Sequence, residues 1–356
     1  MVVAVFFQLL TTGLWENNFI NEAYFPISDQ AWKQIYRMSQ EQSVCGLIYR
    51  GICYLPKHLM PSQELMIKFI TRVDSIERRN RFLNKAVVSL QHLYNQHAIT
   101  AILQKGQGVA SMYEKPLLRE CGDLDYYLSE EDIAKMRRLV EKKGITVFSE
   151  PDGSERYTVN GVYIENHRNL IDIHNYFAKR RLRKILSHKK FEPIAIDEDN
   201  QVIIPEGVVY LIMLNTHILN HALGNGVGLR QLCDMARAYS YYRDVVDFDE
   251  YYDTCQQLHI YKWTVLLDSF LCHYLHLEAI GNPIMSKKEC HAFYRIVMDG
   301  GNFGFINRVN TSVIKRKLNT FKSFVRKADF SFRYSFFEYG GLITSLFIGQ
   351  FKRTSH

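Results

Sequence analysis

Residues 98–128, AITAILQKGQGVASMYEKPLLRECGDLDYYL, predict a strand, a glycine-containing turn and a second strand. The second strand contains Asp123 and Asp125, with Leu124 between them. Because side chains two residues apart on a strand point to the same face, both carboxylates project together while Leu124 points into a core. Two such charges repel each other unless a cation lies between them, and Mg²⁺ prefers carboxylate oxygens together with substrate phosphates. The pair therefore predicts a metal site that receives a triphosphate, although most Asp-x-Asp pairs are only solvated strand ends or turns.

The residues around the acidic pair favour the functional interpretation. The first strand is followed by Lys105, Gly106 and Gly108, and glycines let a backbone approach a ligand closely. Arg119 offers a forked donor that suits phosphate, and Gly122 directly precedes the acidic strand. We therefore interpret these five residues as candidates for nucleotide binding.

Taken together, these residues resemble the uncharacterised bacterial nucleotidyltransferases of the DNA polymerase β-like superfamily. The family pattern is a Lys-Gly turn, a helix that ends in a Tyr-x-x-Pro-like segment, an arginine, and Gly-Asp-x-Asp on a strand. Residues 105–106, 113–116, Arg119 and 122–125 match it in that order. One departure concerns the triphosphate: the Gly-Ser pair that follows the superfamily's first strand is absent, and Gly-Gln or Gly-Val within residues 106–109 stands in its place.

A third carboxylate is expected on another strand, and two residues compete for this role. Asp172 lies between isoleucines in the predicted strand 170–177, where an unpartnered carboxylate would be costly. Glu165 shows a similar alternation on the preceding strand. We favour Asp172, because the superfamily's third acid lies on an apolar strand and a polar residue, here His174, follows it. His174 is expected to pair with this carboxylate, and the alternative is that it binds the metal.

The resemblance implies a reaction and its cofactors. A nucleoside monophosphate would pass from an NTP, such as ATP, to an unknown acceptor hydroxyl, and Mg²⁺ or Mn²⁺ would be the cofactor. Asp123 and Asp125 would hold both metal ions, Asp172 would hold one and orient the acceptor, and Lys105 and Arg119 would neutralise phosphate charge. The alternative is a non-catalytic module of the same fold that binds a nucleotide, RNA or a partner protein.

A later helix adds further candidates. His217 and His221 lie four residues apart and therefore on one face of a predicted helix. Ile218 follows the first histidine where a zinc hydrolase needs glutamate, so that class is disfavoured. The family commonly shows such a helix followed by Gly-Leu-Arg and Asp, here Arg230 and Asp234. These two residues are expected either to face the nucleotide or to form an ion pair that packs two helices.

The periodicity predicts an α+β fold in which a small mixed sheet is embedded between helical regions. A long amphipathic helix is predicted over 62–96, and Asn160-Gly161 between two alternating runs predicts a hairpin. We expect four regions: an N-terminal helical region, the nucleotidyltransferase-like core, a helical domain and a basic, aromatic helical tail. Their predicted limits are 1–97, 98–200, 201–300 and 301–356.

Composition bounds the class of protein. The 356 residues carry a net charge of +7 and lack an apolar run of 18 residues, so no transmembrane helix is expected. The seven cysteines are scattered without a Cys-x-x-Cys pair, which indicates a reducing cytoplasm.

The segment 301–356 contains ten Lys or Arg against two acidic residues. We expect this tail to fold onto the body with its phenylalanines buried, in preference to a membrane or nucleic-acid contact. The phenylalanines concerned are Phe321, Phe324, Phe330, Phe332, Phe336 and Phe337.

Overall fold

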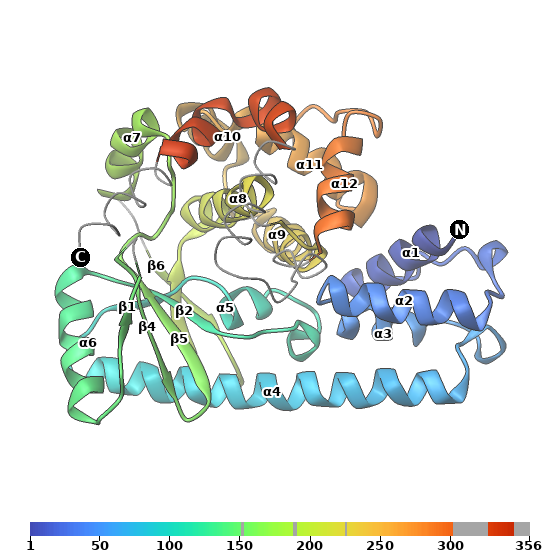
Figure 1. Cartoon of the computed structure of the whole chain (residues 1–356), viewed down its shortest axis with the longest axis horizontal. Helices are drawn as coiled ribbons and strands as arrows, with labels where there is room; N and C mark the ends of the chain where they lie inside the picture. The colour runs from blue at the N-terminus through green and yellow to red at the C-terminus, as the bar shows by residue number, and fades with distance from the viewer. Residues whose placement is uncertain (151–152, 188–190, 225, 302–326, 345–356) are drawn as a thin grey trace, which may run out of the picture.

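The long helix α4 (Gln63–Gln96) is the longest element of the structure and runs along one side of the molecule in Figure 1. This computed structural model describes residues 1–150, 153–187, 191–224, 226–301 and 327–344. The predicted apolar stripe of α4 is buried from Phe69 to Tyr94, which confirms the helix expected over 62–96. One half of α4 packs against the N-terminal helices and the other half lies along the sheet (Figure 1).

Three helices form the N-terminal region. Helices α1 (Val2–Trp15) and α3 (Cys45–Ile52) pack closely because Gly13 and Gly51 each face the other helix's backbone; a Cβ at Gly51 would lie 2.0 Å from the carbonyl oxygen of Leu9. Helix α2 (Asp29–Glu41) lies beside them. Three single-turn 3₁₀ helices occur at Glu22–Tyr24, Lys57–Leu59 and Pro116–Leu118.

The central sheet has five strands in the order β1-β2-β5-β4-β3. Its strands are β1 (Ala101–Leu103), β2 (Leu124–Leu128), β3 (Phe148–Ser149), β4 (Glu155–Val159) and β5 (Val162–His167). Strands β2 and β5 are parallel, whereas the other neighbours are antiparallel, so the sheet is mixed as predicted. The predicted hairpin is confirmed: Asn160 and Gly161 both have positive φ, as the tight turn between β4 and β5 requires. Helix α6 (Glu130–Lys142) packs against β2 and begins at Ser129, whose hydroxyl accepts the N–H of Asp132.

The strand predicted over 170–177 is wrong. The chain after β5 is irregular as far as Asn175, and α7 (Tyr176–Ser187) follows. Side chains satisfy the backbone of this irregular segment in place of a neighbouring strand. Gln104 donates to the carbonyls of Asn169 and Leu170, Asn220 donates to that of Asp172, and Glu338 accepts the N–H groups of His174 and Asn175. After α7, β6 (Phe191–Ala195) and β7 (Gln201–Pro205) form a separate hairpin.

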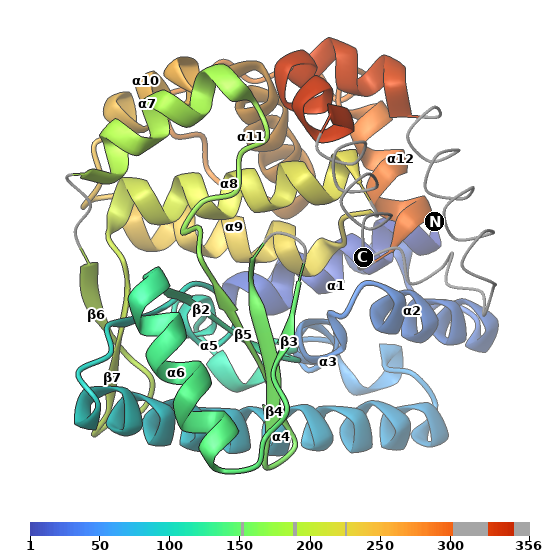
Figure 2. The ribbon, with the colours of Figure 1, turned by 60° about the vertical axis from the view of Figure 1, so that its left-hand side comes forward.

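Above the sheet in Figures 1 and 2 lies a layer of helices. They are α8 (Gly207–Leu223), α9 (Leu229–Tyr242), α10 (Phe248–Gln257), α11 (Tyr261–Leu275) and α12 (His291–Gly300). Their core includes polar groups that satisfy each other, such as the indole N–H of Trp263, which donates to Asn215 at 2.7 Å. The fold is α+β, as the sequence predicted.

Residues 327–344 form a further helix that packs on this layer. Phe330 is buried as predicted and contacts Trp263 and Phe293. Phe332, Phe336 and Phe337 are exposed, so the expectation that they are buried is wrong: Phe332 and Phe336 occupy the face of the helix opposite Phe330 and Tyr334, and Phe337 lies at the edge of the buried face. Phe321 and Phe324 lie outside the described residues. No helix within the described ranges has the length and apolar character to cross a bilayer.

Candidate active site

Two acidic side chains meet at the junction of β2 and β5. The parallel register places Asp125 opposite Glu165 and Tyr127 opposite His167. Alternation along each strand then brings Asp125, Glu165 and His167 to the same face, while Leu124, Tyr126 and Ile164 are buried in the core. One ligand atom from each of the three polar residues lies within 4.8 Å of the other two. Within the part of the chain that the structure describes, this is the group of three with metal-ligand spacing.

Asp125 is the most enclosed of these groups and has two basic partners. His167 Nε2 lies 2.9 Å and Lys105 Nζ 3.3 Å from its Oδ1 atom. Burial favours the neutral acid, but the charge of Lys105 and the hydrogen bond with His167 hold the pKa of Asp125 well below its usual range. Burial likewise disfavours the protonated imidazole, yet the hydrogen bond to Asp125 raises the pKa of His167 above its ordinary value.

Glu165 and Asp123 differ from Asp125 in their electrostatics. Burial raises the pKa of Glu165. The charge of Asp125 also raises it, whereas His167 lowers it. Asp123 precedes β2 and is exposed as a residue, yet partial loss of water and the charge of Asp125 raise the pKa of its carboxyl. It lies outside the group of three described above. A cation beside these carboxylates would relieve their repulsion.

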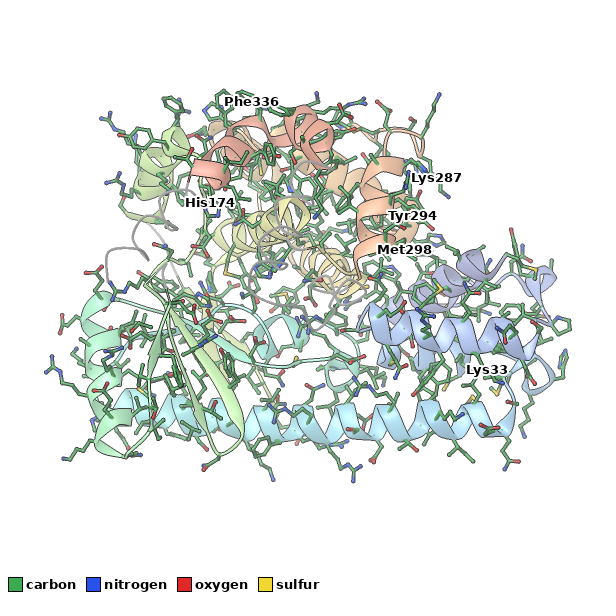
Figure 3. The ribbon with its side chains drawn as sticks, in the orientation of Figure 1. Lys33, His174, Lys287, Tyr294, Met298 and Phe336 are labelled. Atoms are coloured by element: carbon green, nitrogen blue, oxygen red, sulfur yellow. The ribbon has the colours of Figure 1, made fainter. Side chains whose placement is uncertain are left out.

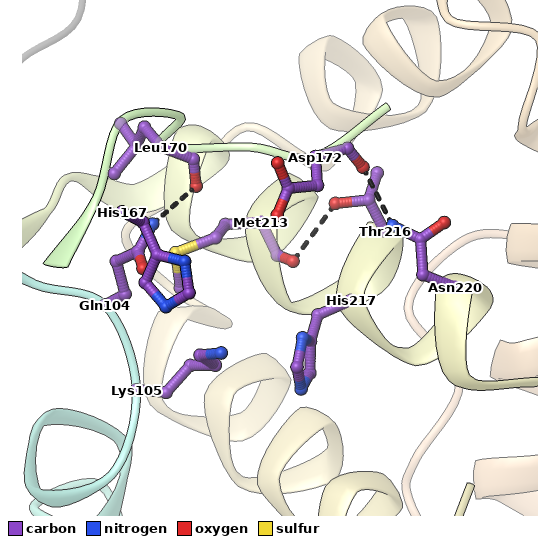
Figure 4. Close-up of a pocket in the computed structure, with 9 residues that line it drawn as sticks. All are labelled: Gln104, Lys105, His167, Leu170, Asp172, Met213, Thr216, His217 and Asn220. Carbon is purple, nitrogen blue, oxygen red and sulfur yellow. Dashed lines mark hydrogen bonds between the residues drawn. The ribbon is translucent and has the colours of Figure 1, made fainter. Parts of the chain in front are cut away.

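A small polar pocket opens beside the carboxylates (Figure 4). The turn after β1, the end of β5, the irregular segment after it and one face of α8 contribute to its wall. Figure 4 shows His167, Lys105 and His217 turned toward the same space, with Asp172 on the wall next to α8. The lining residues are Gln104, Lys105, His167, Leu170, Asp172, Met213, Thr216, His217 and Asn220.

Two histidines of α8 face this charged region. The rings of His217 and His221 meet edge to face at 4.5 Å. Burial, followed by the charge of Lys105, lowers the pKa of His221 to about 3 and holds the pKa of His217 well below its usual value. Both rings are therefore neutral at pH 7 and can accept or donate hydrogen bonds without adding charge.

The sequence of this chain matches a known protein family. Residues 28–273 match the model of a family described as uncharacterised nucleotidyltransferase. The chain belongs to this family. The match runs from Ser28, which caps α2, to within α11 and so includes every element that lines the pocket; the resemblance inferred from residues 105–128 is confirmed.

The similarity of this chain to solved structures is weak. An antigenic nucleotidyltransferase-like protein from Paracoccidioides brasiliensis is 15% identical, and the similarity covers 59% of this chain and 96% of that one with a TM-score of 0.37. No curated protein matches the chain.

In this member of the family, Arg119 and Asp234 form a buried ion pair instead of facing the pocket. The guanidinium donates two hydrogen bonds to the carboxylate, at 2.6 and 2.7 Å, and the hydroxyl of Tyr113 donates a third at 2.7 Å. Both side chains are less than a tenth exposed. The fork of Arg119 is thus used to join the segment before β2 to α9, and phosphate would have to displace Asp234 to reach it. Gly108 serves packing as well, because a Cβ there would lie 3.0 Å from Ile204.

Other candidates from the sequence lie closer to the carboxylates. Gly106 has a φ of +63°, and a Cβ on it would lie 3.3 Å from the carbonyl oxygen of Asp123, so the turn and the acidic strand approach closely here. A Cβ on Gly122 would meet no atom within 4 Å. Arg230 is half-buried and donates to the carbonyl of Glu120 at 2.9 Å. The charge of Arg230 lowers the pKa of Asp123, but burial and the charge of Asp125 raise that pKa by more. Of the two arginines proposed from the sequence, Arg230 affects the ionisation of Asp123, whereas Arg119 pairs with Asp234 and does not line the pocket.

Asp172 and His174 are placed differently from the expectation. Asp172 is exposed on the pocket wall and does not belong to the strand next to Asp125; Glu165 occupies that position. His174 does not line the pocket, and its backbone N–H binds Glu338. Burial lowers the pKa of His174 despite the charge of Asp172.

The sequence analysis missed His167 and Gln104. The signal for His167 was weak: it is two residues from Glu165 and so on the same strand face, but Asn166 between them is polar, unlike Leu124 between Asp123 and Asp125. Gln104 gave no such signal: its role depends on the irregular chain at Asn169 and Leu170, which its amide holds in place.

Proposed function

We propose that this protein transfers a nucleoside monophosphate from an NTP to an acceptor hydroxyl, and that Asp125, Glu165 and His167 hold a divalent cation for this reaction. The observation that carries the proposal is the convergence of these three ligand atoms within 4.8 Å on adjacent parallel strands. Membership of a nucleotidyltransferase family supports the reaction class.

The donor set fits a divalent cation. Two carboxylates and one imidazole offer oxygen and nitrogen ligands, a mixture that suits Mn²⁺ as well as Mg²⁺. Lys105 Nζ lies 3.3 Å from Asp125, and His167 in its neutral form would bind the cation through a ring nitrogen. Asp123 would add a further carboxylate from the rim, where its neighbour Asp125 opposes its ionisation. When bound, such a cation neutralises triphosphate charge and stabilises the attacking and leaving oxygens.

The protein's own residues would position the substrates. Lys105 and Arg230 would bind phosphate oxygens, with Lys105 acting as a point charge and Arg230 as a fork. The absence of a side chain at Gly106 would allow the triphosphate to approach the backbone where the superfamily has its Gly-Ser pair. Asp172 faces the pocket from the wall opposite the sheet and would orient the acceptor hydroxyl and accept its proton.

The experiment that tests this function uses NTPs labelled at the α-phosphate. The full-length protein is incubated with each NTP, Mg²⁺ or Mn²⁺ and fractionated cell extract as the source of acceptor. We expect metal-dependent transfer of label together with release of pyrophosphate. Asp125→Asn should abolish transfer, whereas Asp74→Asn, a matched change at an exposed ion pair on α4, should not.

Two outcomes would redirect the proposal. Metal-dependent NTP binding without transfer to any fraction would favour the non-catalytic binding module, which the missing Gly-Ser pair also favours. Transfer at equal rates by the parent protein and Asp125→Asn would contradict the site itself.

A further inference from the structure

Five aromatic side chains on two helices form an exposed surface that the proposed chemistry does not use. We call it the aromatic patch; Tyr176 and Phe177 of α7 and Phe332, Phe336 and Phe337 of the 327–344 helix make it up. Their exposed fractions are 81, 65, 56, 54 and 46%, in that order. Single exposed aromatic residues are ordinary, but a contiguous group marks a contact surface.

Ring contacts show that the aromatic patch is continuous. Tyr176 contacts Phe177 with ring centroids 6.0 Å apart, and Phe177 contacts Phe337 across the two helices at 6.3 Å. Phe337 contacts Phe336 at 5.4 Å, and Phe336 contacts Phe332 at 5.5 Å. The patch therefore joins segments that lie more than 150 residues apart in the sequence, and Figure 3 places Phe336 on the outer side of the molecule.

Positive charge adjoins the aromatic patch on α7. The helix contains five Lys or Arg and no acidic residue. Arg180, Arg181 and Lys184 follow Phe177 at spacings of three, four and seven, so they share its face, and all three are exposed. Ala178 and Leu182 are buried on the other face. Apolar and basic groups thus face solvent on the same side of one helix, whose opposite side is packed.

We propose that the aromatic patch and the basic face of α7 dock the protein on an anionic membrane surface. Exposed phenylalanines can enter the boundary between headgroups and acyl chains while Lys and Arg bind the anionic headgroups. The charge of α7 is complementary to such a surface. Within the described ranges no helix could span a bilayer, so the contact is peripheral.

Two other occupants fit the observations less well. A single-stranded nucleic acid needs ring faces open for base stacking and a basic groove, whereas these rings contact one another on the outer side of two helices. A symmetric dimer through this surface would bring the basic faces of two α7 helices close together, and like charges would repel.

The docking surface is connected to the pocket wall. Helix α7 follows directly after the irregular segment that contains Asp172. Glu338, which directly follows Phe337 and is buried, accepts the backbone N–H groups of His174 and Asn175. A membrane contact at the aromatic patch would therefore hold this wall of the pocket close to the lipid surface. The proposal does not depend on the chemistry of the pocket.

Vesicle sedimentation with the full-length protein tests the proposal. The vesicles contain phosphatidylcholine alone or equal parts of phosphatidylcholine and phosphatidylglycerol. We expect binding to the mixed vesicles, with weaker binding in high salt and little to neutral vesicles. The double variants Phe332→Ser with Phe336→Ser and Arg181→Glu with Lys184→Glu should each weaken binding by about tenfold or more.

Matched controls change the same residue types elsewhere. Ile67→Ser with Ile70→Ser removes exposed apolar groups from α4, and Lys142→Glu with Lys143→Glu changes the net charge equally at the end of α6; both should bind as the parent does. Equal binding by all variants, or no binding to mixed vesicles, would overturn the proposal. So would concentration-dependent dimerisation that the phenylalanine variant abolishes, or preferential binding of a single-stranded oligonucleotide that the same variant abolishes.

Discussion

His167 Nε2 lies 2.9 Å from Oδ1 of Asp125, and the two residues belong to parallel strands that are adjacent in the sheet but 42 positions apart in the sequence. The contact links a carboxylate of unusually low pKa to an imidazole of raised pKa. Each residue therefore stabilises the charged form of the other in a partly enclosed site.

The first prediction follows from this pair. In Asp125→Asn the imidazole loses the negative charge that favours its protonation, while its burial and the charge of Lys105 remain. We expect the pKa of His167, measured by NMR in metal-free protein, to fall from above to below that of an exposed histidine. An unchanged pKa would mean that the two side chains are not in contact in solution.

The second prediction separates the two candidates for the third carboxylate. Glu165→Gln should lower metal affinity by about a hundredfold or more, because even groups outside a ligand set contribute about 10–100-fold. Asp172→Asn should bind metal as the parent does and lose only transfer activity. Calorimetric titration with Mn²⁺ measures the difference. Loss of metal binding in Asp172→Asn alone would reverse the assignment.

The third prediction contrasts two arginines. Arg119→Met leaves Asp234 buried without its partner, so the free energy of unfolding should fall by about 3–5 kcal/mol. Arg230→Gln should change stability by only about 1 kcal/mol but weaken NTP binding about tenfold, as expected for loss of a hydrogen bond to a charged group. Urea unfolding and nucleotide titration check both values. Strong stability loss in Arg230→Gln with intact NTP binding would contradict these roles.

The fourth prediction concerns pH and stability in the helical layer. Burial raises the pKa of Asp268 to about 6 from an ordinary 3.8, although Asn282, Tyr239 and Tyr252 donate hydrogen bonds to it. Between these two values the folded state holds a proton that the unfolded state has lost. The contribution of Asp268 to stability is thus full below about pH 4 and is lost as the pH rises to about 6.

Asp268→Asn cannot titrate and should remove this dependence. The destabilisation that it causes should be larger at pH 4 than at pH 7 by on the order of 3 kcal/mol. Unfolding measured at both pH values for the variant and the parent gives the comparison directly. A difference of the opposite sign would show that Asp268 is ionised in the folded protein throughout this range.

Local signals in the sequence predicted the local structure well. The apolar stripe from Phe69 to Tyr94 identified α4, and Asn160-Gly161 identified a hairpin. Each depends on residues within a few positions of one another, so no knowledge of the tertiary structure was needed.

The placements that the sequence did not predict depend on contacts between distant residues. Glu165 comes to lie beside Asp125 only because β2 and β5 pair in parallel with one register, which alternation alone does not determine. Arg119 meets Asp234 across 115 positions, and a buried ion pair uses the same residue types as a phosphate site. The segment around Asp172 resembles a strand in its apolar alternation, yet Gln104, Asn220 and Glu338 supply its hydrogen bonds from elsewhere.

Binding of Mn²⁺, followed by electron paramagnetic resonance with and without NTP, tests the central claim most directly. We predict that the parent protein and Asp74→Asn bind Mn²⁺ and that NTP strengthens this binding. Asp125→Asn and Glu165→Gln should each lose it while keeping the parent's circular dichroism spectrum. Equal Mn²⁺ binding by all four proteins would contradict a cation site formed by Asp125, Glu165 and His167.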